Sequence, residues 1–442
     1  MTTGKVRVPL VLRLKTRDNI AGRLQNMRFI AWSVLGSIFK YMWHGPEVQS
    51  WNLRFHIIRD ILRQYLAESL PHDMPNESAE KIDFAYVAEY IAINNLPSRP
   101  LQLDVGINQE HDIVLQPENC VEYNVLHYGL SNNKLREIAA MDLRLAQDGH
   151  PRIISCQVLL STETDRFRNH NLVSNNAAIS ELLPLDPLEP CERIIFHLHG
   201  GAYCVGERSL THMQVYAHIS RTTGLRVFSP DYRLAPKNCF PSQLHDCFAS
   251  YMFLLRRGFK PENIIIAGDS AGGAIALGIM FILRDMNLPM PGAAVLISPW
   301  VDSTCSGESW KTNQKLDYLP AFSLNDPFHP TRMFYAAGKQ FTNEMLEELR
   351  CPLVSPLFGK LNGMPPMLIQ MGRDELLHDD IQAFATKASC DNEGGSKVKL
   401  EIYDNMPHVF VLFDFAEAAQ KAFTNIGDFI RNNVCGPTNN II

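Results

Sequence analysis

The sequence lacks a strong charge bias, paired cysteines and any spacing typical of metal ligands. Its 442 residues include 41 basic and 47 acidic side chains, so the net charge is only −6. Nucleic-acid-binding domains are usually basic, and this balance therefore argues against nucleic acid as the main partner. The ten cysteines are scattered without a CxxC pair, which is typical of buried free thiols in a reducing compartment. We expect a cytoplasmic protein without a metal site.

Long hydrophobic runs are also scarce. The apolar segment 29–43 has an uncharged core of 11 residues before Lys40, whereas a membrane-spanning helix needs about 20. No small-residue cleavage site follows the segment, so we do not expect a secretory signal. Basic residues precede it, and two interpretations fit: a peripheral contact with a membrane or lipid surface, or a flap over an apolar pocket.

The chain has no internal repeat and no low-complexity tract, and its 46% of apolar residues can form a large core. Residues 1–100 look mostly helical, with an amphipathic helix over 51–70, and we expect them to form a helical N-terminal cap or extension. Residues 101–190 mix helical and strand-like patterns. We assign residues 101–442 to one α/β domain.

From residue 192 onwards, strand-like runs alternate with helical segments. Such alternation predicts a mainly parallel sheet with helices on both of its faces. The expected strands of this part are 193–199, 225–232, 263–268, 293–300, 366–372 and 397–404.

One serine stands at a place where the chain must turn sharply. The stretch IIIAGDSAGG puts Ser270 directly after a short apolar run and before the helical run 274–286. A strand that passes at once into a helix forms a tight elbow, and its apical residue adopts a strained conformation. Gly268 and Gly272, which lack a Cβ, relieve the crowding there. The pattern predicts an exposed nucleophilic hydroxyl at the start of a helix.

A serine hydroxyl becomes a good nucleophile only when a base removes its proton. His408 follows the last predicted strand, and loops after parallel strands open at the edge to which the elbow points. A structural histidine packed against Phe410 is the alternative interpretation. The stretch 371–380, MGRDELLHDD, offers four carboxylates, among them Asp374 and Glu375, one of which can orient the base. The order serine, acid, histidine is that of a nucleophile-elbow hydrolase.

Acyl transfer also requires hydrogen-bond donors for the oxyanion of the tetrahedral intermediate. The stretch HLHGGAY ends a predicted buried strand, and its Gly200 and Gly201 let backbone N–H groups approach a ligand closely. The amide of Ala271, at the start of the helix after the serine, is the third candidate donor.

Five short blocks resemble the hormone-sensitive lipase family of α/β-hydrolases. They are HGGAY, DYRLAP, GDSAGG, SPWVD and PHVF, which occur in this order within residues 190–434. The family also contains arylacetamide deacetylases, fungal steryl-acetate esterases and bacterial carboxylesterases. The resemblance implies an α/β-hydrolase fold with a cap formed by N-terminal helices and an insertion at about 302–347. It maps the oxyanion loop onto Gly200, Gly201 and Ala271, and it implies that His199 anchors this loop.

The resemblance also selects among the acids. The family pattern resembles acid-x-Leu-x-Asp followed by a second acid, and the frame that starts at Glu375 fulfils it. The frame that starts at Asp374 puts His378 where an acid is required. Most relatives use aspartate, so a glutamate is a departure that the fold accepts. We predict Glu375 as the acid and keep Asp374 as the alternative.

These residues together predict a serine carboxylic-ester hydrolase that needs no cofactor. Ser270 would attack the carbonyl of a small-molecule ester, His408 would transfer the proton, and Glu375 would steady His408. The apolar N-terminal helices favour a lipid-like or aromatic ester. An amidase, a deacetylase or an acyltransferase could use the same triad. A ligand-binding receptor on this fold would retain the pocket but break the triad.

Overall fold

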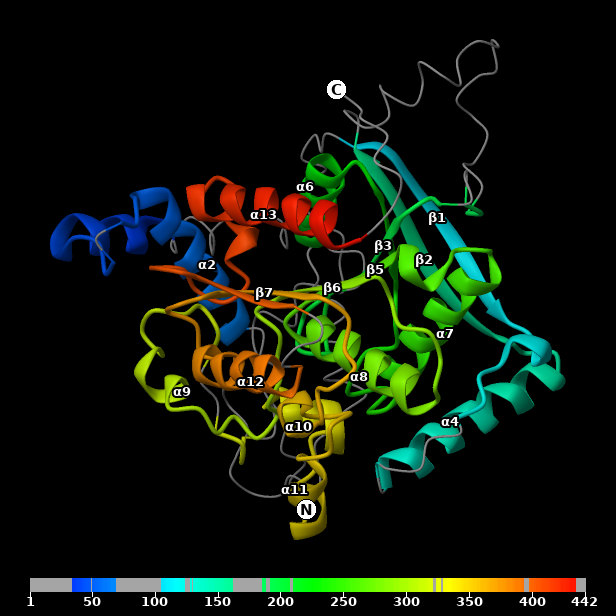
Figure 1. Ribbon diagram of the computed structural model, residues 1–442. Coiled ribbons are helices and arrows are strands. Elements are labelled where there is room, and N and C mark those ends of the chain that lie inside the picture. Colours follow the sequence, from blue (N-terminus) through cyan, green and yellow to red (C-terminus); the bar gives the residue numbers. More distant parts are fainter. Residues whose placement is uncertain are drawn as a thin grey trace, which may run out of the picture.

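The computed structural model describes most of the chain. The described residues are 34–48, 50–68, 105–123, 128, 130–161, 185–187, 191–206, 210–320, 323–326, 329–392 and 397–434. They form one eight-stranded sheet that carries helices on both faces (Figure 1).

The sheet is mainly parallel and has one antiparallel edge. Its strand order is β1-β2-β4-β3-β5-β6-β7-β8. Strands β1 and β2 pair antiparallel, as do β2 and β4, and all later neighbours are parallel. The strands are β1 Val105–Leu115, β2 Arg152–Ser161, β3 Ile194–Leu198, β4 Arg226–Pro230, β5 Ile264–Asp269, β6 Ala293–Ile297, β7 Met367–Gly372 and β8 Val398–Tyr403.

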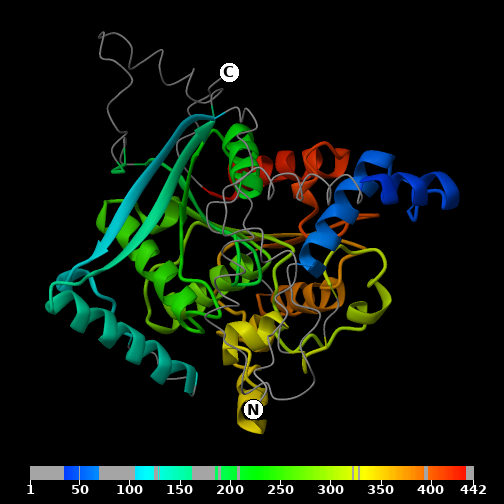
Figure 2. The same ribbon diagram turned by 180° about the vertical axis from the view of Figure 1, so that it is seen from behind.

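Helices α6 and α13 cover one face of the sheet, and α7, α8 and α12 cover the other (Figures 1 and 2). Successive residues of β5 consequently face different cores: Ile264 and Ile266 pack in one, and Ile265 and Ala267 in the other. Strands covered on both faces read as continuous apolar runs. The helices are α2 Leu53–Glu68, α4 Leu130–Gln147, α6 Leu210–Thr223, α7 Ser242–Arg256, α8 Ala271–Asp285, α9 Ser309–Thr312, α10 Pro330–Ala336, α11 Asn343–Glu348, α12 His378–Asp391 and α13 Glu417–Asn433.

All six strands predicted after residue 192 are present, and their bounds differ from the predicted ones by at most three residues. The prediction missed β1, whose sequence VGINQEHDIVL carries five polar or charged residues in a row. An edge strand with a neighbour on one side only tolerates this polarity. The helix after the serine begins at Ala271 rather than at 274. Of the nine cysteines in the described part, only three are buried, fewer than expected.

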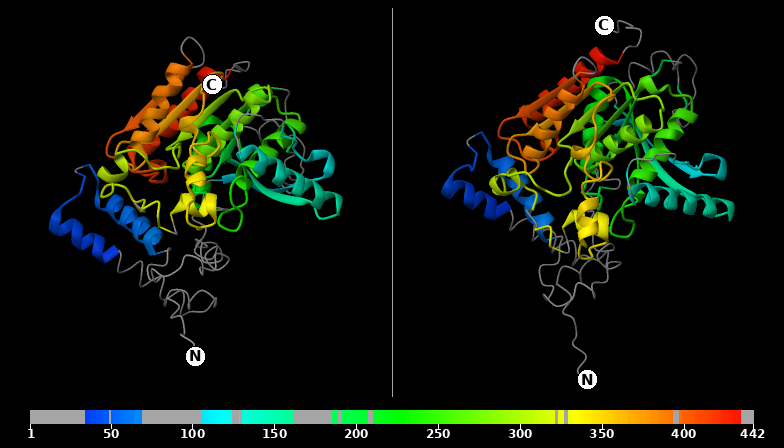
Figure 3. Two further views of the ribbon diagram at one scale, coloured as in Figure 1. Left: turned by 90° about the horizontal axis from the view of Figure 1, so that it is seen from below. Right: turned by 60° about the horizontal axis from the view of Figure 1, so that its bottom comes forward.

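The described N-terminal residues form two helices at the β8 end of the sheet, residues 34–44 and α2 (Figure 3). Residues 1–33, 49 and 69–100 of the predicted extension, among them residues 29–33 of the apolar segment, lie outside the described residues. Within the described ranges, no helix is both long and apolar enough to cross a bilayer. The segment between β6 and β7 carries α9, α10 and α11, and the division into extension, domain and insertion at 302–347 stays a prediction.

Candidate active site

Ser270 lies at the sharp turn between β5 and α8. Its φ of 52° and ψ of −120° confirm the strained conformation expected at the elbow. A Cβ on Gly268 would come within 2.5 Å of the backbone of Gly272, and one on Gly272 within 2.0 Å of the carbonyl oxygen of Leu198. The two glycines are therefore required by close backbone approach, and Ser270 sits at the carboxyl edge of the sheet.

His408 and Glu375 form a continuous chain of hydrogen bonds with the serine. The Nε2 atom of His408 lies 2.9 Å from the Oγ atom of Ser270, and its Nδ1 atom lies 3.0 Å from Oε2 of Glu375. Glu375 is fully buried, and His408 is 3% exposed. The backbone N–H of Asp374 donates to the carbonyl of Met406 at 3.0 Å. Glu375, rather than Asp374, thus faces the imidazole.

The loops that carry Glu375 and His408 are in close backbone contact. They follow the neighbouring parallel strands β7 and β8, whose carboxyl ends share one edge of the sheet. A Cβ on Gly372 would lie 2.1 Å from the carbonyl oxygen of Met406, so the two loops meet at their backbones. The hydroxyl of Ser298 accepts a hydrogen bond from the amide of Val409 at 3.1 Å and fixes the far side of the histidine loop.

Burial shifts the pKa values of Glu375 and His408 in opposite directions. It raises the pKa of the Glu375 carboxyl, against which a hydrogen bond from Ser298 acts. It lowers the pKa of His408, against which the carboxylates of Asp317 and Asp269 act. Groups this close titrate as a pair rather than singly. The neutral imidazole can therefore accept the serine proton at neutral pH.

The glycine-rich loop after β3 lies beside Ser270, and its backbone amides differ in their hydrogen bonding. The N–H of Gly200 donates to Oδ2 of Asp269 at 3.1 Å, whereas an oxyanion donor must be free to bind its ligand; its role as a donor stays a prediction. The next residue, Gly201, has a φ of 109°, and Ala202 has one of 54°. Within the described ranges, the amides of Gly201, Ala202 and Ala271 have no hydrogen-bond acceptor.

The loop is held in place by stacked aromatic rings. The imidazole of His199 stacks on Tyr232 with ring centroids 4.1 Å apart, and the Tyr232 hydroxyl donates to the carbonyl of His199 at 2.7 Å. Burial lowers the pKa of His199 to about 3, so this ring is neutral. Asp269 lies 3.3 Å from Nε2 of His212. Burial opposes the charge of Asp269, yet the surrounding histidines, His212 foremost, hold its pKa at about 2.

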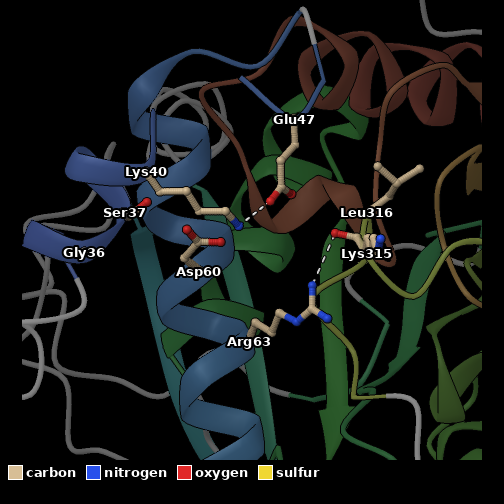
Figure 4. Close-up of a pocket in the computed structure, with 8 residues that line it drawn as sticks. All are labelled: Gly36, Ser37, Lys40, Glu47, Asp60, Arg63, Lys315 and Leu316. Carbon is tan, nitrogen blue, oxygen red and sulfur yellow. Dashed lines mark hydrogen bonds and ion pairs between the residues drawn. The ribbon is translucent and has the colours of Figure 1, made fainter. Parts of the chain in front are cut away.

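An open cavity lies elsewhere, between the N-terminal helices and the residues just before Asp317. Its lining includes Lys40, Asp60, Arg63 and Lys315, but none of the residues hydrogen-bonded to His408 (Figure 4). Among the described residues, no group of three or more His, Cys, Asp or Glu side chains could hold a metal ion.

The comparisons with known proteins identify the class to which this fold and site belong. The model of the α/β-hydrolase fold family matches residues 195–412. An esterase of Acinetobacter venetianus is 35% identical over 239 residues, which are 54% of this chain and 74% of that protein. The chain belongs to the hormone-sensitive lipase family of α/β-hydrolases and is an ester hydrolase.

Other relatives agree with this family. An acetyl-hydrolase of Streptomyces hygroscopicus is 36% identical over 49% of this chain and 68% of that protein. The crystal structure of an esterase from the bacterial hormone-sensitive lipase family is similar with a TM-score of 0.55 and 26% identity. The similarity covers 85% of this chain and 98% of that one.

Proposed function

We propose that this esterase acts through a triad of Ser270, His408 and Glu375. The hydrogen-bonded chain of these three side chains is the observation that carries the proposal. Ser270 attacks the ester carbonyl while His408 takes its proton, and His408 then protonates the leaving alcohol. Water hydrolyses the acyl-enzyme by the same route, and the Glu375 carboxylate stabilises the imidazolium in both halves of the reaction.

The tetrahedral oxyanion is stabilised by the amides of Gly201, Ala202 and Ala271. This assignment replaces Gly200 by Ala202, because the amide of Gly200 already donates to Asp269. The other three amides lack an acceptor within the described ranges. Donors left unsatisfied in the free enzyme are available for the charge that develops in the transition state.

The substrate is an ester with a lipid-like or aromatic group. The backbone N–H of Trp300 donates to the backbone carbonyl of Ser270 at 2.9 Å, so the backbones of the two residues are neighbours. The ring of Tyr203 lies 5.7 Å from that of Trp300 and 3.7 Å from that of Phe334, centroid to centroid. Aromatic surroundings favour an apolar acyl or alcohol group. Rates on p-nitrophenyl esters of increasing chain length test this preference. Rates on the matching anilides test whether the enzyme prefers esters to amides.

Replacement of the nucleophile tests the triad. Ser270→Ala should lower kcat by about 10⁶-fold, the cost of removing a triad nucleophile. Ser270 is only 8% exposed, but its hydroxyl makes a single hydrogen bond, to His408. Circular dichroism and thermal unfolding should therefore stay at the wild-type values. Turnover of p-nitrophenyl esters within tenfold of wild type would refute the mechanism.

A lipid surface is the proposed contact of the helix at residues 34–44. Leu35, Phe39, Met42 and Trp43 lie on one face of this helix and are 56–79% exposed. Aromatic and aliphatic side chains on one helix face suit the boundary between headgroups and acyl chains. Phe39→Glu should abolish sedimentation with phosphatidylcholine–phosphatidylserine vesicles, whereas Leu346→Glu, at an exposed leucine of α11, should not. Equal vesicle binding by both variants would exclude this contact.

A further inference from the structure

A second buried carboxylate lies beside the two loops of the triad. Asp317 belongs to the segment between β6 and β7 and is fully buried. Its Oδ2 atom accepts a hydrogen bond from the amide of Leu376 at 2.7 Å, and Oδ1 accepts one from the amide of His408 at 3.3 Å. Oδ1 also accepts from the amides of Tyr318 and Leu319. One carboxylate thus bridges the loop after β7 and the loop after β8.

Two arginines of α2 contact the segment that carries Asp317. Arg59 donates to the carbonyl of Lys315 at 3.0 Å. Arg63 donates to the same carbonyl at 3.2 Å (Figure 4). The Arg59 side chain is itself fully buried and paired with Glu47. A buried arginine with several partners has little freedom to move. The position of Asp317 is therefore set by packed structure on both sides.

The charge of Asp317 acts on His408. Burial raises the pKa of Asp317 to about 6, while His408 and the donated amides act against this shift. In return, Asp317 is the strongest of the charges that raise the pKa of His408, ahead of Asp269, although burial outweighs both. Glu375 faces Nδ1 of His408, and His378 acts against the rise in the pKa of Glu375. Above about pH 6 the Asp317 carboxylate favours the imidazolium.

We propose that Asp317 is a positioning residue of the triad, which holds the Glu375 and His408 loops in register and stabilises the protonated histidine. The inference rests on the proposed roles of Ser270 and His408. As the bond from Oγ to the carbonyl carbon forms, the proton passes from Ser270 to Nε2 of His408. It then passes to the alkoxide as the ester bond breaks. Asp317 exchanges no proton in this cycle and acts through its charge and its four amide contacts.

Two matched variants test the role. Asp317→Asn removes the charge and presents an NH₂ group to backbone N–H donors. We expect kcat to fall about 10²-fold, as for a misplacement of a catalytic group by about 1 Å, with KM little changed. The acid limb of kcat/KM should move to lower pH. The control is Asp380→Asn: Asp380 is also buried, accepts from the Trp310 indole at 2.8 Å and has a pKa raised by burial to about 7. This control should keep the wild-type kcat and acid limb.

The results separate positioning from general stability. Equal losses in both variants, or a loss in Asp317→Asn without a shift of the acid limb, would overturn the proposal. If Asp317→Asn does not fold, the pH profile of the wild-type enzyme provides the test. Protonation of Asp317 together with the triad should make log(kcat/KM) fall with decreasing pH at a slope steeper than one. A slope of one would overturn the proposal. Failure of the proposed function has a different signature, which is activity retained by Ser270→Ala.

Discussion

Replacing Glu375 by glutamine tests which acid orients the base. The Glu375 carboxylate is fully buried and lies 3.0 Å from Nδ1 of His408. A glutamine of the same size can present its NH₂ group to Nδ1, which forces the imidazole proton onto Nε2. His408 can then no longer accept the proton of Ser270. The same exchange of acid for amide in a serine-protease triad lowers kcat about 10⁴-fold, which corresponds to about 5 kcal/mol of barrier.

The neighbouring acid provides the control for this experiment. Asp374 is half-buried and contacts the histidine loop through its backbone N–H rather than its carboxylate. Asp374→Asn should therefore keep kcat within about tenfold of wild type, since substitutions away from buried networks have small effects. Steady-state rates on a p-nitrophenyl ester, normalised by active-site titration, compare the two variants. A large loss in Asp374→Asn together with a small one in Glu375→Gln would refute the assignment.

The acid limb of the pH profile of kcat/KM should lie below the usual histidine pKa of about 6.5, because burial lowers the pKa of His408. Rates measured by pH-stat titration locate this limb, and a limb above about 6.5 would contradict the effect of burial. Gly272→Ala should lower both yield and thermal stability, because its Cβ would lie 2.0 Å from a backbone oxygen of β3, whereas Gly278→Ala would meet only a flexible leucine at 3.1 Å and should be tolerated. Deletion of residues 1–45 should weaken vesicle binding and keep the turnover of soluble esters. Deletion of residues 1–68, which also removes α2, should lower kcat on every ester. Equal turnover by the two truncated proteins would show that α2 is dispensable.

The central strands could be predicted because burial on both faces leaves a plain signal. A strand such as β5, with the sequence IIIAGD, has no polar alternation and is bounded by glycine. Strand β1 gives no such signal, since Asn108 to Asp112 are all polar or charged. Its place depends on pairing with β2, which is a contact between distant segments that no local pattern encodes.

The nucleophile and the base could be predicted because the chain order and the elbow follow from the fold itself. The oxyanion donors depend instead on which amides are already satisfied. Gly200 is a plausible donor in the sequence, but the approach of Asp269 to its N–H appears only in three dimensions. The one available signal for Ala202 was its place directly after the glycine pair. A non-glycine residue with a φ of 54° is uncommon and is typical of functional sites.

The N-terminal helix α2, together with Trp51 just before it, belongs to the structural support of the histidine loop. The indole N–H of Trp51 donates to the carbonyl of Asn405, three residues before His408. The ring of Phe55 stacks between Trp51 and Phe413, with centroids 4.7 and 4.3 Å away. Loss of a buried aromatic side chain costs about 3–5 kcal/mol, and here the loss falls on the loop that carries the base. Supporting the base is therefore a role of α2 that does not require it to cover the substrate.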